Sequence, residues 1–158
     1  MNRYRIQWVS ALIGLTLMGM GFSTAHASGL PLYEATYTTK VMGIKVTLNR
    51  SLTWDDGRFH LSQAGNTFLL KLNEDSHFSL NENQIVGEEF VYQLGGVSNR
   101  RRQVLFDQQN GIIRSLKKEE WTEHPWSPDV LDRLSQQEQM RLKLLGSKTP
   151  PERISLSI

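Results

Sequence analysis

The stretch that decides the fold is IKVTLNRSLTWDDG, residues 44–57. Its apolar residues recur with a period of two, at Ile44, Val46, Leu48, Leu52 and Trp54. This alternation predicts a long β-strand with one buried face and one wet face, so Trp54 is expected in the core. Asp56-Gly57 at its end predicts a tight hairpin turn, because glycine accepts the positive φ that such turns require.

The residues around this stretch predict further strands separated by turns. The expected strands cover residues 33–38, 58–62, 67–72, 76–80, 84–94, 99–106 and 112–117. Short strands at near-regular spacing are typical of an antiparallel meander. We therefore expect a mainly β domain, built as a curved antiparallel meander or a partial barrel and packed against one C-terminal helix.

A helical pattern replaces the strand pattern near the C-terminus. Ser127 suits the cap of a helix, Pro128 its first position and Asp129 its positive end. Apolar residues then follow at near-helical spacing, at Val130, Leu131, Leu134, Leu142 and Leu145. The sequence predicts a terminal helix over residues 128–145 and an irregular tail over residues 146–158.

The N-terminus has the three parts of an export signal. Arg3 and Arg5 form a basic region, residues 9–22 are apolar and uncharged, and residues 25–27 read Ala-His-Ala. This order is typical of a secretory signal peptide with a small-residue cleavage site. Residues 1–27 are therefore expected to be removed during export.

Cleavage between Ala27 and Ser28 would leave residues 28–145 as one β-rich domain in the periplasm. The alternative is an uncleaved anchor. Because the apolar run is shorter than the about 20 residues that a spanning helix needs, we prefer cleavage. The mature protein is then not expected to be an integral membrane protein.

Export also removes the apparent basic excess of the chain. Without Arg3 and Arg5, 16 of the 18 basic residues remain, against 16 acidic residues. Proteins that bind nucleic acid normally carry a clear basic excess on one face, so we expect no nucleic-acid partner. The chain has no cysteine, which excludes a disulfide framework and a lipid-modified N-terminal cysteine.

No residue pattern indicates catalysis or a cofactor. His60, His77 and His124 stand at no metal-ligand spacing, and we interpret them as ordinary, partly exposed histidines. Glu119-Glu120 is expected within a strand, where neighbouring side chains point to opposite faces and cannot share a proton. The sequence contains no nucleophile elbow and no phosphate-binding loop. We therefore expect a protein that is not an enzyme and holds neither metal nor cofactor.

The candidate ligand-binding site centres on the expected strand 99–106. Its residues are Arg100, Arg102, Val104, Phe106 and Tyr92. The first four share one strand parity, so their side chains would lie on one face. The two arginines would then form a basic rim at the end of the apolar row made by Val104 and Phe106. The expected floor consists of Ile44, Val46, Leu48, Phe90 and Tyr92. Arginine pairs bidentately with phosphate or carboxylate, so such a site suits a lipid with an anionic head. The alternative is a solvated strand end that blunts edge pairing.

Two classes of function remain open. One is the binding of an apolar or amphiphilic envelope ligand such as a lipid. The other is an envelope assembly or scaffold role, in which an exposed sheet edge pairs with another protein. Trp54, Trp121 and Trp126 raise a further hypothesis, an aromatic platform for glycans, although core packing is the preferred interpretation of Trp54.

Several short motifs occur in a distinctive order: LPLYEA at residues 30–35, Met42-Gly43, Asp55-Asp56-Gly57 and Ser127-Pro128-Asp129. Together they resemble a family of exported bacterial proteins, catalogued as the domain of unknown function numbered three-one-zero-eight. The resemblance covers Leu30 to about Leu145. It implies an exported, mostly antiparallel β protein, and it supplies no activity, cofactor or catalytic residue.

Members of that family usually continue past this helix with further strands, whereas here the pattern changes at Gly146. One hypothesis is therefore that the chain is a truncated product, and the other is that it is a naturally short relative. Truncation would leave an unpaired sheet edge and a partly uncovered core, both of which favour aggregation.

Overall fold

The computed structural model describes residues 29–41, 44–97 and 99–147. The strands are β1 (Tyr33–Val41), β2 (Ile44–Asp55), β3 (Arg58–Asn66), β4 (Leu70–Asn81), β5 (Gln84–Gly96), β6 (Arg100–Asp107), β7 (Ile112–Lys117) and β8 (Glu120–Pro125), followed by the helix α1 (Arg133–Leu145). The expected signal peptide, its cleavage point at Ala27 and Ser28, and residues 148–158 of the tail lie outside the described residues.

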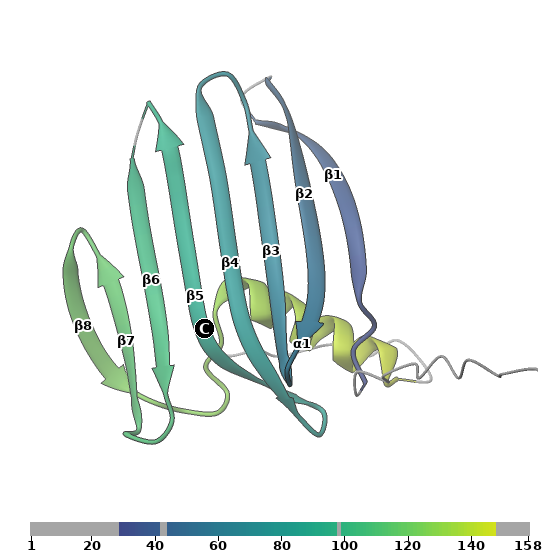
Figure 1. Cartoon of the computed structure of the whole chain (residues 1–158), viewed down its shortest axis with the longest axis vertical. Helices are drawn as coiled ribbons and strands as arrows, with labels where there is room; N and C mark the ends of the chain where they lie inside the picture. The colour runs from purple at the N-terminus through teal and green to yellow at the C-terminus, as the bar shows by residue number, and fades with distance from the viewer. Residues whose placement is uncertain (1–28, 42–43, 98, 148–158) are drawn as a thin grey trace, which may run out of the picture.

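The strands form one open antiparallel meander (Figure 1). Each strand pairs with the next along the chain, in the order β1 to β8, so β1 and β8 are the edges. The fold class is confirmed as a mainly β meander packed against one C-terminal helix, and the sheet does not close into a barrel. The Asp-Gly turn joins β2 to β3, with the expected positive φ at Gly57 and a positive φ at Asp56 as well.

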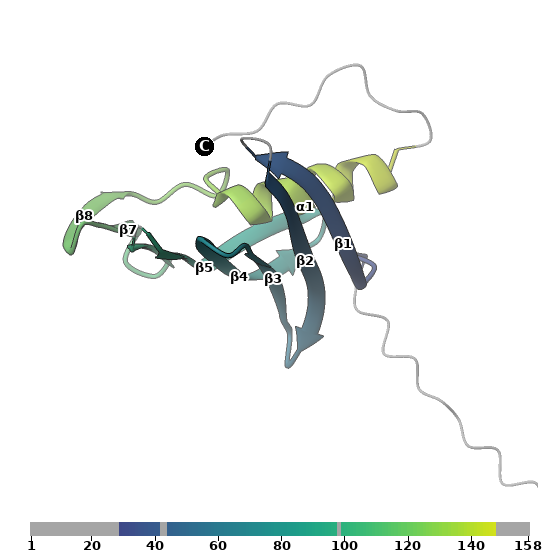
Figure 2. The ribbon, with the colours of Figure 1, turned by 90° about the horizontal axis from the view of Figure 1, so that it is seen from above.

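The core lies where α1 covers one face of the sheet. Figure 2 shows α1 lying against this face, and in Figure 1 it crosses the lower half of the strands. The buried residues come from the strands and from the helix: Leu52, Phe59, Leu61, Phe78, Ile85, Phe90, Leu131, Leu134 and Leu142. Phe59 and Phe78 stack with ring centroids 5.4 Å apart. Because α1 runs across the strands, its width covers only their lower half, and the other half of this face stays uncovered.

The helix begins at Arg133 and not at Pro128, so the expected helix start is wrong. Asp132 is the cap, and its side chain accepts hydrogen bonds from the backbone N–H groups of Leu134 and Ser135 at 2.8 and 3.0 Å. The segment Ser127-Pro128-Asp129 forms a turn, closed by the Val130 N–H donating to the Ser127 carbonyl. Ser127 and Asp132 are both suitable capping residues. The helix starts after Asp132 because this start lets the helix pack on the sheet.

Two predictions about strands are also wrong. Residues 70–72 of the first expected strand and all of the expected strand 76–80 form one strand, β4, whereas residues 67–69 form the turn before it. The polar residue Glu74 in the middle of β4 is buried and accepts a hydrogen bond from Gln63 on β3. Glu119 is not in a strand: with Lys118 it forms the turn to β8, and both residues have positive φ. Strand β8, which starts at Glu120, has no counterpart among the expected strands.

Trp54 is not in the core, since 38% of its surface is exposed. It has the expected parity, because it pairs with the buried Phe59 on β3. On its other side, β1 begins at Tyr33, which pairs with Leu52. Trp54 therefore lies beyond the end of the neighbouring edge strand and stays open to solvent. Trp121 on β8 is 48% exposed, so it does not pack in the core either.

Candidate ligand-binding surface

A row of polar residues crosses the helix side of the sheet just beyond the core. Cross-strand pairing places Arg50, Gln63, Glu74, Tyr92, Arg102 and Lys117 in this row. From α1, Glu138 accepts hydrogen bonds from Arg50 at 3.0 Å and from the Tyr33 hydroxyl at 2.6 Å. Arg133 forms an ion pair with Glu74. These contacts fix the helix on the sheet, and the uncovered half of the face begins beyond the polar row.

The uncovered half carries an apolar strip. We define the apolar strip as Tyr37, Ile44, Val46, Leu48, Leu70, Leu72 and Leu94. Strand alternation places these residues on the helix side, because Leu48 shares the parity of the buried Leu52. Within the strip, Tyr37, Ile44 and Leu70 are 49%, 37% and 40% exposed.

In one cross-strand row of the strip, a glycine stands between two leucines, and a leucine side chain fills the space above it. Leu48 on β2 pairs with Gly65 on β3, which pairs with Leu72 on β4. A Cβ atom at Gly65 would lie 2.4 Å from Cδ2 of Leu48, so the Leu48 side chain lies over the glycine and fills the space between the two leucines. The strip is therefore continuous across β3.

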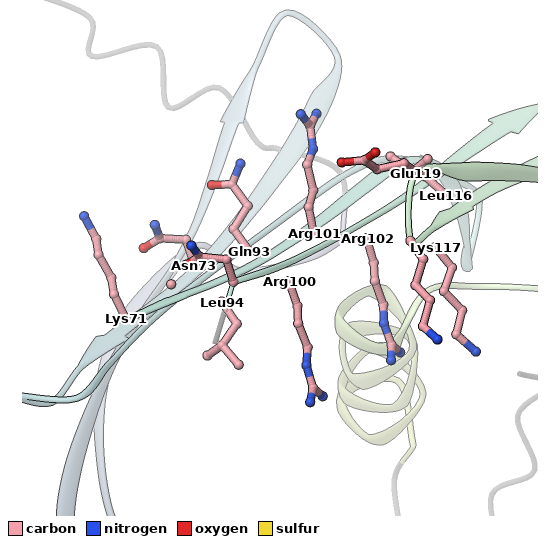
Figure 3. Close-up of a pocket in the computed structure, with 13 residues that line it drawn as sticks. Lys71, Asn73, Gln93, Leu94, Arg100, Arg101, Arg102, Leu116, Lys117 and Glu119 are labelled. Carbon is pink, nitrogen blue, oxygen red and sulfur yellow. The ribbon is translucent and has the colours of Figure 1, made fainter. Parts of the chain in front are cut away.

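The same row ends at an arginine. Leu72 pairs with Leu94 on β5, and Leu94 pairs with Arg100 on β6. In Figure 3 the Leu94 and Arg100 side chains extend from the same side of the sheet, the side on which α1 lies. An apolar surface therefore meets a cationic side chain directly, with no strand between them.

Arg100 belongs to a basic cluster that surrounds this corner of the sheet. We define the basic cluster as Lys71, Arg100, Arg101, Arg102, Lys117 and Lys118. All six line an open depression of about 1120 Å³, and of the described residues that line it only Glu119 is acidic. Figure 3 shows Arg100, Arg102 and Lys117 on the helix side and Arg101 on the opposite side. The cluster therefore wraps around the end of the sheet.

The charges of the basic cluster are not neutralised within the described part of the protein. There, no salt bridge joins any of the six side chains to a carboxylate. Arg102 and Lys117 are direct cross-strand partners, and like charges in this position repel, although Lys117 also has the acidic Glu120 opposite it on β8. A bound anion would relieve this repulsion.

Of the five site residues expected from the sequence, only Arg100 and Arg102 line this depression. Tyr92 and Val104 pack against the core beside α1. Phe106 lies over Gly87, where a Cβ atom would come within 3.1 Å of its ring. These three side chains share the expected parity, but Tyr92 and Val104 pack against the core and Phe106 covers Gly87, so none of them lines the depression.

The residues expected to form the apolar floor of the site also lie partly in the open half of the sheet and partly in the core. Ile44, Val46 and Leu48 belong to the apolar strip, whereas Phe90 is 7% exposed and forms part of the core. Four members of the basic cluster, Lys71, Arg101, Lys117 and Lys118, were not expected at the site. The sequence could have predicted Lys117 and Lys118, because the hairpin expected between β6 and β7 brings them beside Arg100–Arg102.

Elsewhere in the described residues, no group of three or more His, Asp or Glu side chains is arranged to hold a metal ion. His60 and His77 stack across β3 and β4 with ring centroids 4.4 Å apart, and His60 Nε2 lies 2.9 Å from Asp75 Oδ1. His124 contacts the Ser115 hydroxyl on β7 at 3.1 Å. The described part of the chain also contains no helix long and apolar enough to cross a membrane.

No protein-family model matches the chain. No curated protein matches it, and no solved structure matches it. The resemblance to the exported family of unknown function therefore stays a prediction, and any function has to be argued from the surface itself.

Proposed function

We propose that this protein is exported to the periplasm and binds an anionic amphiphile of the cell envelope without catalysing a reaction on it. The observation that carries the proposal is the pairing of Leu94 with Arg100, where the apolar strip meets the basic cluster. A ligand with a hydrocarbon chain and an anionic head would match this surface, with its chain on the apolar strip and its head at the basic cluster.

The two parts of the surface would contribute differently. The apolar strip would remove hydrocarbon from water, which is favourable in proportion to the area buried. Arg100 and Arg102 would pair with the head through charge-assisted hydrogen bonds, which are stronger than neutral ones. Because Leu94, Arg100 and Arg102 extend from the helix side of the sheet, the ligand would lie along that face with its head at the end of the sheet.

The test compares a fluorescent fatty acid, parinaric acid, with its uncharged methyl ester, both below their aggregation concentrations. In the double variant Arg100→Ala with Arg102→Ala, the dissociation constant for the acid is expected to rise by roughly ten- to hundredfold, because each bond lost at this solvent-exposed site contributes about 0.5–1.5 kcal/mol. The constant for the ester should stay unchanged, because it depends on the apolar strip alone.

Arg114→Ala is the matched control, since Arg114 is an exposed arginine on β7 outside the depression. Leu72→Ser should weaken the binding of both probes, which separates the strip from the charges. If the wild-type protein binds neither probe, or if the double variant binds the acid as tightly as the wild type does, the proposed function is wrong.

The second candidate function is pairing with another envelope protein through a sheet edge. Strand β8 favours it, because all six of its residues are exposed and, among the described residues, it has a neighbouring strand on one side only. Such an edge accepts an added strand. Native mass spectrometry of protein taken from its own periplasm distinguishes the candidates: retained lipid supports the first, and a stoichiometric complex with another protein supports the second.

A further inference from the structure

Two turns lie side by side at the end of the sheet away from α1 (Figure 1). One is the β3–β4 turn, residues 67–69, and the other begins at Val97 after β5. The Val97 N–H donates to the Leu69 carbonyl at 3.2 Å, which joins the two turns. Gly96 allows this approach, because its φ is +116° and a Cβ atom there would lie 2.1 Å from the Leu69 carbonyl oxygen.

The β3–β4 turn has a defined shape. The Thr67 side-chain oxygen accepts hydrogen bonds from the backbone N–H groups of Leu69 and Leu70, at 3.2 and 3.0 Å. The Thr67 N–H in turn donates to the Leu70 carbonyl at 2.7 Å. These bonds hold the residue between Thr67 and Leu69, which is Phe68, at the tip of the turn.

The side chains at this tip are apolar and exposed. Phe68 is 83% exposed, Val97 is 79% exposed and Leu69 is 41% exposed. Turns normally carry polar residues and glycine, so an exposed phenylalanine beside an exposed valine departs from ordinary turn chemistry. Grouped apolar side chains that protrude into water indicate a surface that contacts an apolar partner. We define Phe68, Leu69 and Val97 as the apolar tip.

The basic cluster lies immediately behind the apolar tip. Lys71 follows the first turn by two residues, and Arg100–Arg102 open the strand after the second turn. Figure 3 shows that the arginines of the cluster extend from both sides of the sheet. A ligand lying on one face would meet only half of these charges, whereas a flat anionic surface across the end of the sheet would meet both sets.

We propose that this end of the molecule docks on an anionic lipid bilayer, with the apolar tip inserted among the head groups and the basic cluster above it. Apolar side chains bordered by lysine and arginine are the combination that interfacial proteins use, and long basic side chains reach the head groups while their stems stay apolar. Negative surface potential attracts such clusters. The inference deepens the proposed function, since it identifies the source of the amphiphile as a membrane whose lipids lie beside the apolar strip.

The test measures co-sedimentation with vesicles of phosphatidylcholine plus phosphatidylglycerol, and with vesicles of phosphatidylcholine alone. The wild-type protein is expected to bind only the vesicles that contain phosphatidylglycerol, and to be released at about 0.5 M salt, where exposed charges are strongly screened. Phe68→Ser with Val97→Ser, and separately Lys71→Glu with Arg101→Glu, should each lower the partition coefficient by roughly tenfold or more.

Matched controls lie far from the tip. Leu32→Ser removes an apolar side chain that is 49% exposed, and Lys143→Glu reverses an exposed charge on α1; neither should change vesicle binding. Because the chain has no cysteine, an environment-sensitive label on Phe68→Cys reports insertion directly. Its emission should shift on adding anionic vesicles, and a label on Leu32→Cys should not shift.

The parinaric acid assay separates the failure of this inference from the failure of the proposed function. The variant Phe68→Ser with Val97→Ser should keep the wild-type affinity for the free fatty acid. If the wild-type protein ignores anionic vesicles, binds both kinds of vesicle equally, or binds them undiminished without Phe68 and Val97, the docking surface is refuted, whatever the fatty-acid result. Capture of double-stranded DNA in preference to the anionic vesicles would likewise overturn it.

Discussion

At the scale of single residues, the position of the helix depends on Glu138. Its side chain is 2% exposed and forms ion pairs with Arg50 at 3.0 Å and with Arg141 at 2.7 Å. The Tyr33 hydroxyl donates to the same carboxylate. Arg50 is itself 7% exposed, so removal of the carboxylate would leave a buried cation without a counter-charge.

Glu138→Gln is therefore expected to lower the free energy of unfolding by about 3–5 kcal/mol, the usual cost of breaking a buried ion pair. The exposed acid Glu120 is the control, and Glu120→Gln should change stability by less than about 0.5 kcal/mol. Urea denaturation followed by circular dichroism measures both changes. Combining Glu138→Gln with Arg50→Met should cost less than the sum of the single changes, and simple additivity would contradict the pairing.

Tyr33 gives this network a pH dependence. Burial, followed by the hydrogen bond and the negative charge of Glu138, raises the pKa of the Tyr33 hydroxyl above its ordinary value of 10.0. The folded state then holds the proton more tightly than the unfolded state does. This contribution to stability is complete below pH 10, and it is lost as the pH rises from there towards the pKa of the folded state.

Tyr33→Phe should thus be less stable than the wild type at neutral pH, by about 1–3 kcal/mol for a hydrogen bond to a charged group. The difference should shrink above pH 10, because the wild type alone loses this contribution there. Urea midpoints measured at neutral pH and at several alkaline values check the trend. Tyr37→Phe is the control, and a stability gap for Tyr33→Phe that widens with pH would contradict the assignment.

At the scale of elements, one aspartate determines where α1 starts. The Asp132 carboxylate caps the helix, and its Oδ2 atom also accepts hydrogen bonds from the hydroxyls of Ser135 at 2.6 Å and of the buried Ser76 on β4 at 2.9 Å. The cap is therefore also a link between helix and sheet. Asp129, which the local pattern favours, instead accepts an exposed hydrogen bond from Gln84.

Asp132→Ala should accordingly destabilise the protein by about 2–4 kcal/mol, the sum of a lost helix cap and an unsatisfied buried hydroxyl. Asp129→Ala is the matched control and should cost less than about 0.5 kcal/mol. Thermal unfolding of the two variants under one set of conditions makes the comparison. Equal losses would mean that the helix starts at the earlier segment.

At the scale of the whole molecule, the sheet has a packed half and an open half. The packed half holds the core under α1, and the open half carries the apolar strip, the basic cluster and the apolar tip. Beyond both, β7 and β8 extend away from the helix (Figures 1 and 2). Local stability follows burial and hydrogen bonding, so these regions should open with different free energies.

Hydrogen–deuterium exchange should therefore be slowest in peptides that cover Leu61, Ser76 and Phe90, which lie in neighbouring strands of the packed half. Peptides from β8 should exchange fastest among the strands, because all six residues are exposed at a sheet edge. Mass spectrometry of quenched, digested samples resolves these regions. Uniform protection from β3 to β8 would contradict this difference in local stability between the core strands and the β8 edge.

The sequence by itself determined the elements whose signals are local. The period-two pattern of residues 44–54 and the Asp56-Gly57 turn specify β2, its hairpin and the parity of its side chains, because strand geometry alternates the two faces whatever lies beside them. The same reasoning identifies Arg100 and Arg102 as one side of β6. The meander follows, since short turns between successive strands leave antiparallel neighbours as the simplest arrangement.

Only the tertiary structure decided which part of the sheet the helix covers. Trp54 and Phe106 have the parity of buried or site residues, yet one lies beyond the end of β1 and the other packs on Gly87. The sequence predicts two strands on either side of residues 73–75, whereas Glu74 is buried within one strand because its partners come from β3 and α1. The basic cluster arises in the same way, because lysines and arginines from three separate strand ends meet only when the strands align. Burial and proximity depend on partners that are distant in the sequence, and a local pattern carries no information about them.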